Sequence, residues 1–213
     1  MSFVKRFGHR FPFTLGMLVL LGATAVFTNT HLATLTNNWL TRLGYSPSDL
    51  WLFNWERLFT SALVTFGKTV FWQAMGMIAL AVGAAEWLAG SKRTAVTFWG
   101  VHLTTLLTES LLVALPLHLS GNPTGTALIL ARDVGPSAGY FGALGLASRR
   151  LPSPWPWLSG TAVVIGLVYA LFQAPRTGQS APVKLAADLA HLIAFPLGWA
   201  TGKLMYLPKG DKQ

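Results

Sequence analysis

The sequence predicts an all-α integral membrane protein that forms a single domain over residues 1–213. Hydrophobic residues make up 52% of the chain and charged residues only 11%, whereas a soluble domain carries about 25% charge. Apolar runs of membrane length alternate with short basic turns, and most of the nine tryptophans flank these runs, as expected at a bilayer interface. A chain of this length accommodates about five to seven membrane helices.

Composition also excludes several kinds of protein. The absence of cysteine rules out disulfides, thiolate metal sites and a thiol nucleophile. The formal net charge of +9 would suit a nucleic-acid-binding protein, but the basic residues form small groups between apolar runs instead of one stripe. We therefore expect this charge to face membrane lipids and predict no nucleic-acid partner.

Six spans are predicted, at about residues 11–28, 69–88, 94–115, 134–148, 158–173 and 183–206. The first has the basic start of a signal peptide, but its length and the spans that follow favour a membrane helix. Residues 29–68 lack an apolar run of membrane length and predict short amphipathic helices in the interface. Residues 116–130, which contain Gly, Pro and Asn, predict a loop.

The distribution of basic residues orients the predicted spans. With a cytoplasmic N-terminus, ten basic residues face the cytoplasm: Lys5, Arg6, Arg10, Lys92, Arg93, Arg149, Arg150, Lys203, Lys209 and Lys212. Six lie on the other side: Arg42, Arg57, Lys68, Arg132, Arg176 and Lys184. This bias satisfies the positive-inside rule. It predicts a multi-pass protein of the cell inner membrane with both termini in the cytoplasm.

The glycine-rich segment 133–145 carries two polar residues on one helix face, Asp133 and Ser137. Its small residues would let neighbouring helices approach closely, and the serine could simply bond its own backbone. However, at about 1.5 Å per residue, Ser137 lies about 18 Å from Arg149, and His191 lies equally far from Lys203. A serine and a histidine at one depth predict a nucleophile and its base.

Other polar residues fall near the same depth. Three acids lie about one turn further out, and with His102 they form a predicted supporting cluster: Glu109, Asp133 and Asp188. Such a cluster could instead hold a metal, relay protons or lock the helices together. Its spacing matches no recognised ligand pattern, so no metal and no cofactor is predicted. Arg132 is expected to pair with its neighbour Asp133 at the interface, and Trp55 and Arg57 to anchor the second span.

Two of these segments resemble motifs of the rhomboid family of intramembrane serine proteases. Gly135-Pro-Ser137-Ala is similar to the Gly-x-Ser-Gly motif of the family's short fourth helix, with the closing glycine displaced to Gly139. The stretch from Ala190-His191 to Gly198 resembles the sixth-helix Ala-His-x-x-Gly-x-x-x-Gly, with alanine in place of one glycine. The resemblance implies a six-helix fold with Ser137 as nucleophile and His191 as base.

Two further elements follow in matching order, so the resemblance covers about residues 55–202. Trp55-Glu-Arg57 resembles the Trp-Arg element of the family's first loop, and Glu86 followed by Gly-Ser resembles a second-helix pattern. The sequence departs from active members at the second helix. Val70 and Ala74 stand where the family's His-x-x-x-Asn would stabilise the oxyanion, and Gln73 is the one displaced candidate donor.

Two functions therefore remain open. The chain is a candidate intramembrane serine endopeptidase that would cleave a membrane-anchored protein with Ser137 and His191. Alternatively, it is a non-catalytic relative that binds transmembrane partners or serves as a subunit of a larger membrane complex. The serine–histidine pair favours the first function, and Val70 and Ala74 favour the second.

Overall fold

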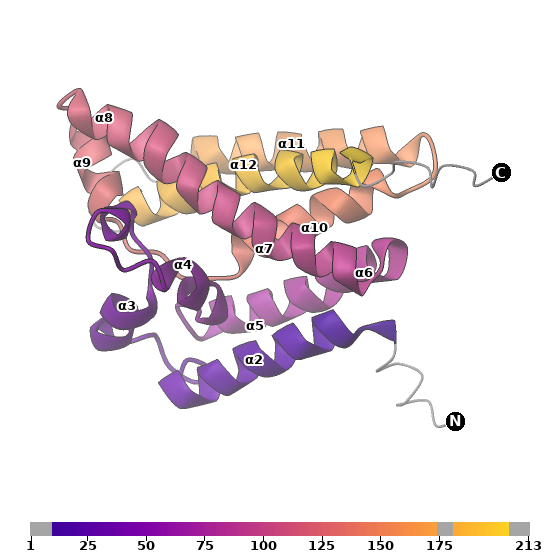
Figure 1. The fold of residues 1–213 in the computed structure, drawn as a ribbon, viewed down its shortest axis with the longest axis horizontal. Helices are drawn as coiled ribbons and strands as arrows, with labels where there is room; N and C mark the ends of the chain where they lie inside the picture. Colours follow the sequence, from indigo (N-terminus) through magenta and orange to yellow (C-terminus); the bar gives the residue numbers. More distant parts are fainter. Residues whose placement is uncertain (1–9, 174–180, 205–213) are drawn as a thin grey trace.

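A computed structural model describes residues 10–173 and 181–204 (Figure 1). These residues form helices joined by short connections and contain no strand, although two isolated β-bridges pair Thr34 with Gly67 and Tyr45 with Asp133. Five of the basic residues used above to assign orientation lie outside the described part of the chain: Lys5, Arg6, Arg176, Lys209 and Lys212. The end of the last predicted span, residues 205–206, lies outside it too.

The first helix, α2, spans Pro12–Thr28. Proline suits the first helical position, because the amide it lacks would have no intrahelical acceptor. Glu86 satisfies the next amides: its carboxylate accepts hydrogen bonds from Phe13 N–H at 2.9 Å and from Thr14 N–H at 2.8 Å. A buried carboxylate from another helix therefore caps the start of α2.

The connection after α2 contains short helices, as the sequence predicts. They are α3 (Asn37–Leu43), η1 (Pro47–Leu50), α4 (Arg57–Thr60) and η2 (Ser61–Leu63). The 3₁₀ helix η1 begins with a capping box in which Ser46 and Asp49 satisfy each other's backbone amides.

Two long helices follow, and each includes a π-helical turn. One runs through α5 (Thr69–Met77), η3 (Ile78–Val82) and α6 (Gly83–Ala89). The other runs through α7 (Ser91–Thr108), η4 (Glu109–Ala114) and α8 (Leu115–Leu119). Turns of this kind are rare and frequently mark functional sites.

The loop predicted at residues 116–130 is wrong for most of its length. The end of α8 covers its start, and α9 (Pro123–Leu130) covers its second half. Asn122 caps α9 by accepting a hydrogen bond from Thr124 N–H at 2.9 Å, and Pro123 occupies the first helical position. Asn followed by Pro is thus a helix start here.

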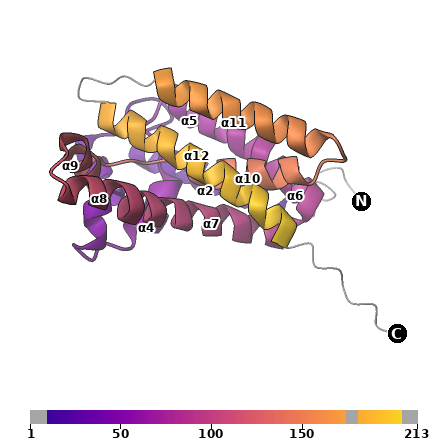
Figure 2. The same cartoon turned by 90° about the horizontal axis from the view of Figure 1, so that it is seen from above.

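The last three helices are α10 (Ser137–Arg149), α11 (Trp155–Gln173) and α12 (Ala181–Leu204). Helix α10 lies at the centre of the bundle, against α7, α12, α6 and α11 (Figures 1 and 2). Its packing against α12 is close: a Cβ added to Gly198 of α12 would lie 1.9 Å from the Gly142 carbonyl oxygen. Glycine allows the two backbones to touch.

Four helices of the described chain are long and apolar enough to cross a membrane: Thr69–Ala89, Ser91–Leu119, Trp155–Gln173 and Ala181–Lys203. Helix α2 is apolar but shorter, with 17 residues, and α10 has 13. The sequence places six spans on these same six helices, and four of them meet the length expected of a span.

Candidate functional site

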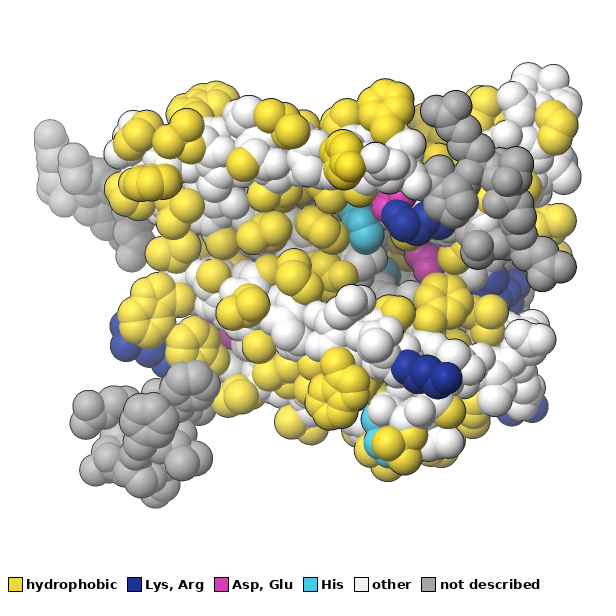
Figure 3. Space-filling model, turned by 180° about the vertical axis from the view of Figure 1, so that it is seen from behind, with side chains coloured by type: hydrophobic (Ala, Val, Ile, Leu, Met, Phe, Trp, Pro, Cys, Tyr) yellow, Lys and Arg dark blue, Asp and Glu magenta, His cyan; other side chains and the backbone are white. Residues whose placement is uncertain are grey.

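A cavity of about 600 Å³ brings together the two residues predicted to carry chemistry. Ser137 at the start of α10 and His191 in α12 both line it, with α5 and the segment before α10 forming other walls. Figure 3 shows a hollow on an otherwise mostly hydrophobic face, where histidine, acidic and basic side chains gather. Ser137 and His191, to which the sequence assigns the same depth in the membrane, thus line one cavity.

The first loop holds the segment that leads into Ser137. Asp133 exchanges backbone hydrogen bonds with Tyr45, at 2.8 and 3.0 Å, and Gly135 N–H donates to the Ser61 carbonyl at 2.8 Å. Gly135 has φ +144°, a conformation that side-chain-bearing residues rarely adopt. The glycine turns the chain so that α10 begins directly at the serine.

His191 is oriented by an aromatic ring of α10. Its imidazole lies against Phe141, with ring centroids 4.3 Å apart and planes tilted by 35°. Its Nε2 atom is buried and has no hydrogen-bond partner among the described residues. A buried polar atom without a partner is costly, so contacts among the described residues do not account for the position of this nitrogen.

The expected hydrogen bond between Ser137 and His191 is absent from the described part of the chain, where the serine hydroxyl makes no hydrogen bond at all. The simpler interpretation, in which Ser137 bonds its own helix backbone, is therefore also wrong. Both residues line the cavity. Catalytic hydrogen bonds are often long before substrate binds, so this geometry is compatible with a nucleophile and base.

Asp188 makes no hydrogen bond with His191 among the described residues, although its charge acts on the imidazole. It is buried and forms an ion pair with Lys184, one helical turn earlier on α12, and both residues line the cavity. The sequence offered a signal for this pair, since an acid and a base four residues apart share a helix face. Lys184 is thus a cavity residue that motif reasoning missed.

The predicted polar cluster is assembled only in part. Asp133 and Asp188 line the cavity, whereas Glu109 does not line it but is buried and interacts electrostatically with Asp133. His102 lies elsewhere: its Nε2 is 3.0 Å from the Leu58 carbonyl oxygen, which can only accept, so Nε2 carries the proton. His102 thereby fastens α4 to α7.

A metal-binding interpretation of these residues is unsupported as well. Within residues 10–173 and 181–204, no three His, Asp or Glu side chains are grouped closely enough to hold an ion.

Both side chains and backbone amides can donate hydrogen bonds near Ser137. Val70 and Ala74 line the cavity at the positions where the family resemblance expects donors, and neither can donate a hydrogen bond. Gln73 lines it too and carries an amide. The amides of Ser137 and its two successors precede the first hydrogen bond of α10, from Tyr140 N–H to the Pro136 carbonyl at 3.0 Å. These free amides form the positive end of the helix dipole.

A buried carboxylate in the first loop fixes the approach to this site. Asp49 accepts from Arg57 Nη1 at 2.6 Å and from Arg132 Nη1 at 2.8 Å. The ion pair predicted between Arg132 and Asp133 is therefore wrong, and Arg57 is a partner of Asp49 beyond any role as an anchor. Burial raises the pKa of Asp49, but hydrogen bonds from Ser46 N–H, Arg132 and Asn54 outweigh it and leave the pKa below its ordinary value.

Comparison of the chain with protein-family models, with curated proteins and with solved structures finds no match. The geometry of the cavity and the sequence motifs that line it therefore carry the functional argument.

Proposed function

We propose that this chain is a six-span, rhomboid-like membrane protein in which Ser137 and His191 form the nucleophile and base of an intramembrane serine endopeptidase. One observation carries the proposal: Ser137, at the start of a helix, and His191, whose buried Nε2 has no hydrogen-bond partner among the described residues, line the same cavity. The substrate would be a protein with a transmembrane helix, because the site lies among helices long enough to span a bilayer.

The reaction follows from these groups. His191 Nε2 takes the proton of Ser137 Oγ as the oxygen bonds to the substrate carbonyl carbon, and the free amides of α10 stabilise the resulting oxyanion. The imidazolium then protonates the leaving amine as the peptide C–N bond breaks, which leaves an acyl-enzyme. Water activated by the same nitrogen hydrolyses the ester and restores the serine.

The proposed topology places α2 and α10 in the membrane beside the four longer helices. Basic residues cluster where α2 and α7 begin and where α10 and α12 end, and these points lie at the same end of the molecule (Figure 1): Arg10, Lys92, Arg93, Arg149, Arg150 and Lys203. We place this end, with both termini, in the cytoplasm and the chain in the cell inner membrane.

A serine-reactive fluorophosphonate probe tests the proposal. The wild-type chain should label, Ser137→Ala should lose the label, and His191→Gln should label at a small fraction of the wild-type rate. Ser159→Ala is the matched control, because the Ser159 hydroxyl bonds its own helix backbone at 2.7 Å and does not line the cavity. Labelling that persists in Ser137→Ala, or a folded wild type that never labels, would exclude the enzyme.

A second function is favoured by the residues at the expected oxyanion positions. Val70 and Ala74 line the cavity without a donor, and Ser137 and His191 are not hydrogen-bonded. A non-catalytic relative would use the same cavity to receive a transmembrane partner or would serve as a subunit of a larger membrane complex. In that case the probe fails to label wild type, and a transmembrane protein co-purifies.

A further inference from the structure

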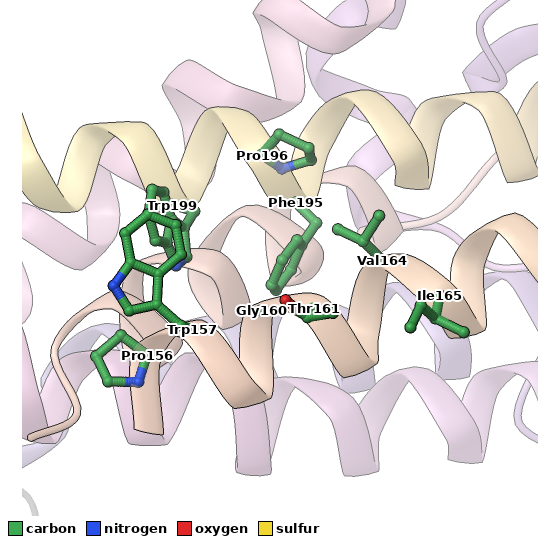
Figure 4. A pocket seen from close by; sticks show the side chains of 9 residues that line it. All are labelled: Pro156, Trp157, Gly160, Thr161, Val164, Ile165, Phe195, Pro196 and Trp199. Carbon is green, nitrogen blue, oxygen red and sulfur yellow. The ribbon is translucent and has the colours of Figure 1, made fainter. Parts of the chain in front are cut away.

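A second cavity, of about 300 Å³, lies between α11 and α12, away from the serine. We call it the α11–α12 groove. Pro156, Trp157 and Gly160 line it from α11, and Phe195, Pro196 and Trp199 line it from α12. Figure 4 shows two indoles at one end and Val164 and Ile165 at the other. Residues 157–165 span about 12 Å of helix. The groove is thus a long apolar surface, and we call its end at Trp157 and Trp199 the mouth.

The mouth of the groove lies beside a cation, Arg149, that pairs with no acid among the described residues. The Arg149 guanidinium lies 4.4 Å from the centre of the Trp199 ring and 5.8 Å from that of Trp157. Its only interactions with described residues are these two ring contacts. Gly202 helps to aim it, because a Cβ there would lie 2.7 Å from Arg149 Cγ, so the arginine stem runs across the bare glycine.

The mouth also contains a buried donor, the Trp199 indole N–H, that finds no acceptor in the described part of the chain. Trp199 Nε1 has no hydrogen-bond partner among the described residues, and it lies over Gly160, where an added Cβ would be 3.4 Å away. Indole N–H groups usually find a partner when buried. Within residues 10–173 and 181–204 neither this N–H nor the guanidinium has an oxygen partner; both groups favour an oxygen ligand, and the guanidinium favours an anion.

The occupant must therefore combine an anionic, oxygen-rich group with an apolar chain. We propose that the α11–α12 groove binds one anionic phospholipid, whose phosphate contacts Arg149 and Trp199 and whose acyl chain lies along Val164 and Ile165. The site faces the basic end of the bundle, so the lipid belongs to the leaflet that meets this end. Trp157 and Trp199 are the aromatic residues that a headgroup boundary favours.

Native mass spectrometry of the purified full-length chain in detergent tests the site. Phosphatidylglycerol and phosphatidylcholine with identical acyl chains are titrated separately. One phosphatidylglycerol should bind at least about tenfold more tightly than phosphatidylcholine. Glycerol 3-phosphate, which carries the anion without the chains, should bind far more weakly, and equal binding of this small anion would overturn the lipid proposal.

Four variants locate the site. Arg149→Gln keeps the stem and removes the charge, and Trp199→Phe keeps the ring and removes the N–H; both should reduce the preference to a few-fold or less. Val164→Phe should block the acyl channel without touching the mouth, which keeps the test valid if Arg149→Gln folds poorly. Arg93→Gln removes an exposed arginine at the same end and should change nothing.

Four further results would overturn the proposal. Three are the absence of a preference in wild type, an equal loss in Arg93→Gln and Arg149→Gln, and unchanged binding in Val164→Phe. The fourth is a dimer that Val164→Phe dissociates, because a second copy would then occupy the groove.

Discussion

Arg132 reaches both carboxylate oxygens of Asp49, with Nη1 2.8 Å from Oδ2 and Nη2 3.4 Å from Oδ1, although 83 residues separate them in the chain. Arg132 also donates to the Gly44 carbonyl at 2.6 Å. Because Arg132 directly precedes the segment that enters α10, this pair ties the first loop to the residues that position Ser137. The first loop is therefore part of the site's support.

Removing the Asp49 carboxylate should destabilise the protein strongly. Asp49→Ala leaves Arg57 and Arg132 partly buried without their shared partner, and breaking a buried ion pair from one side costs about 3–5 kcal/mol. Thermal unfolding in detergent should show a large drop in the midpoint, and proteases should cut the first loop sooner. Glu56→Ala is the control, because that exposed carboxylate lies 4.0 Å from Arg57 and such a pair contributes about 0–1 kcal/mol. Equal effects of the two variants would contradict the role of Asp49.

The same carboxylate should make stability depend on pH. Its pKa is lower in the folded protein than in the unfolded chain, so the unfolded state binds more protons as pH falls. The contribution is complete above the ordinary aspartate pKa of about 3.9 and is lost as pH falls through the lower folded value. The difference in unfolding midpoint between wild type and Asp49→Asn should be large at neutral pH and should shrink below about pH 4. A difference that stays constant across this range would show that Asp49 does not titrate in this way.

Supplying side-chain donors at the cavity should raise activity if the protein is a protease. Val70→His with Ala74→Asn places two donors one turn apart on the cavity wall. One oxyanion donor accounts for about 10² to 10³ in turnover, so cleavage of a transmembrane reporter should rise by at least tenfold. The rise should vanish when Ser137→Ala is added. Trp72→His places a histidine on α5 at an exposed position that does not line the cavity and should have no effect.

Close packing between α10 and α12 should not tolerate a methyl group. Gly198→Ala would place Cβ 1.9 Å from the Gly142 carbonyl oxygen, which forces the helices apart and should cost about 1–3 kcal/mol. Resistance to unfolding by dodecyl sulfate measures this cost. Gly166→Ala in α11 meets nothing within 4 Å and should be neutral or slightly stabilising. If Gly198→Ala behaves like Gly166→Ala, the contact between these two helices does not limit stability.

Helix positions were predictable where hydropathy and basic turns mark both ends. The span predicted at residues 69–88 is the helix Thr69–Ala89, and the one predicted at 158–173 is α11 with three more residues at its start. Helix α9 was missed because its apolar run is short and begins among loop-forming residues. The combination of Asn122 and Pro123 was the available signal, since asparagine caps helices and proline starts them.

The site was predictable in depth but not in direction. Counting residues along a helix fixes the level of a side chain, and this brought Ser137 and His191 to one cavity. The count does not fix the direction around the helix axis relative to neighbours, so His102, which bonds Leu58, was wrongly grouped with them. The prediction of the Arg132 ion pair was wrong for a related reason. Arg132 was matched to its nearest acid in sequence, whereas the folded chain gives it Asp49.

The cap on α2 sets an order for biosynthesis. Glu86 emerges from the ribosome 72 residues after Thr14, whose amide it accepts. At about 5–20 residues per second, translation takes about 4–14 seconds to cover that distance. During this interval the first turn of α2 has to draw its hydrogen bonds from water or from the translocation machinery. Helix α6, which carries Glu86, then supplies the cap for the helix made before it.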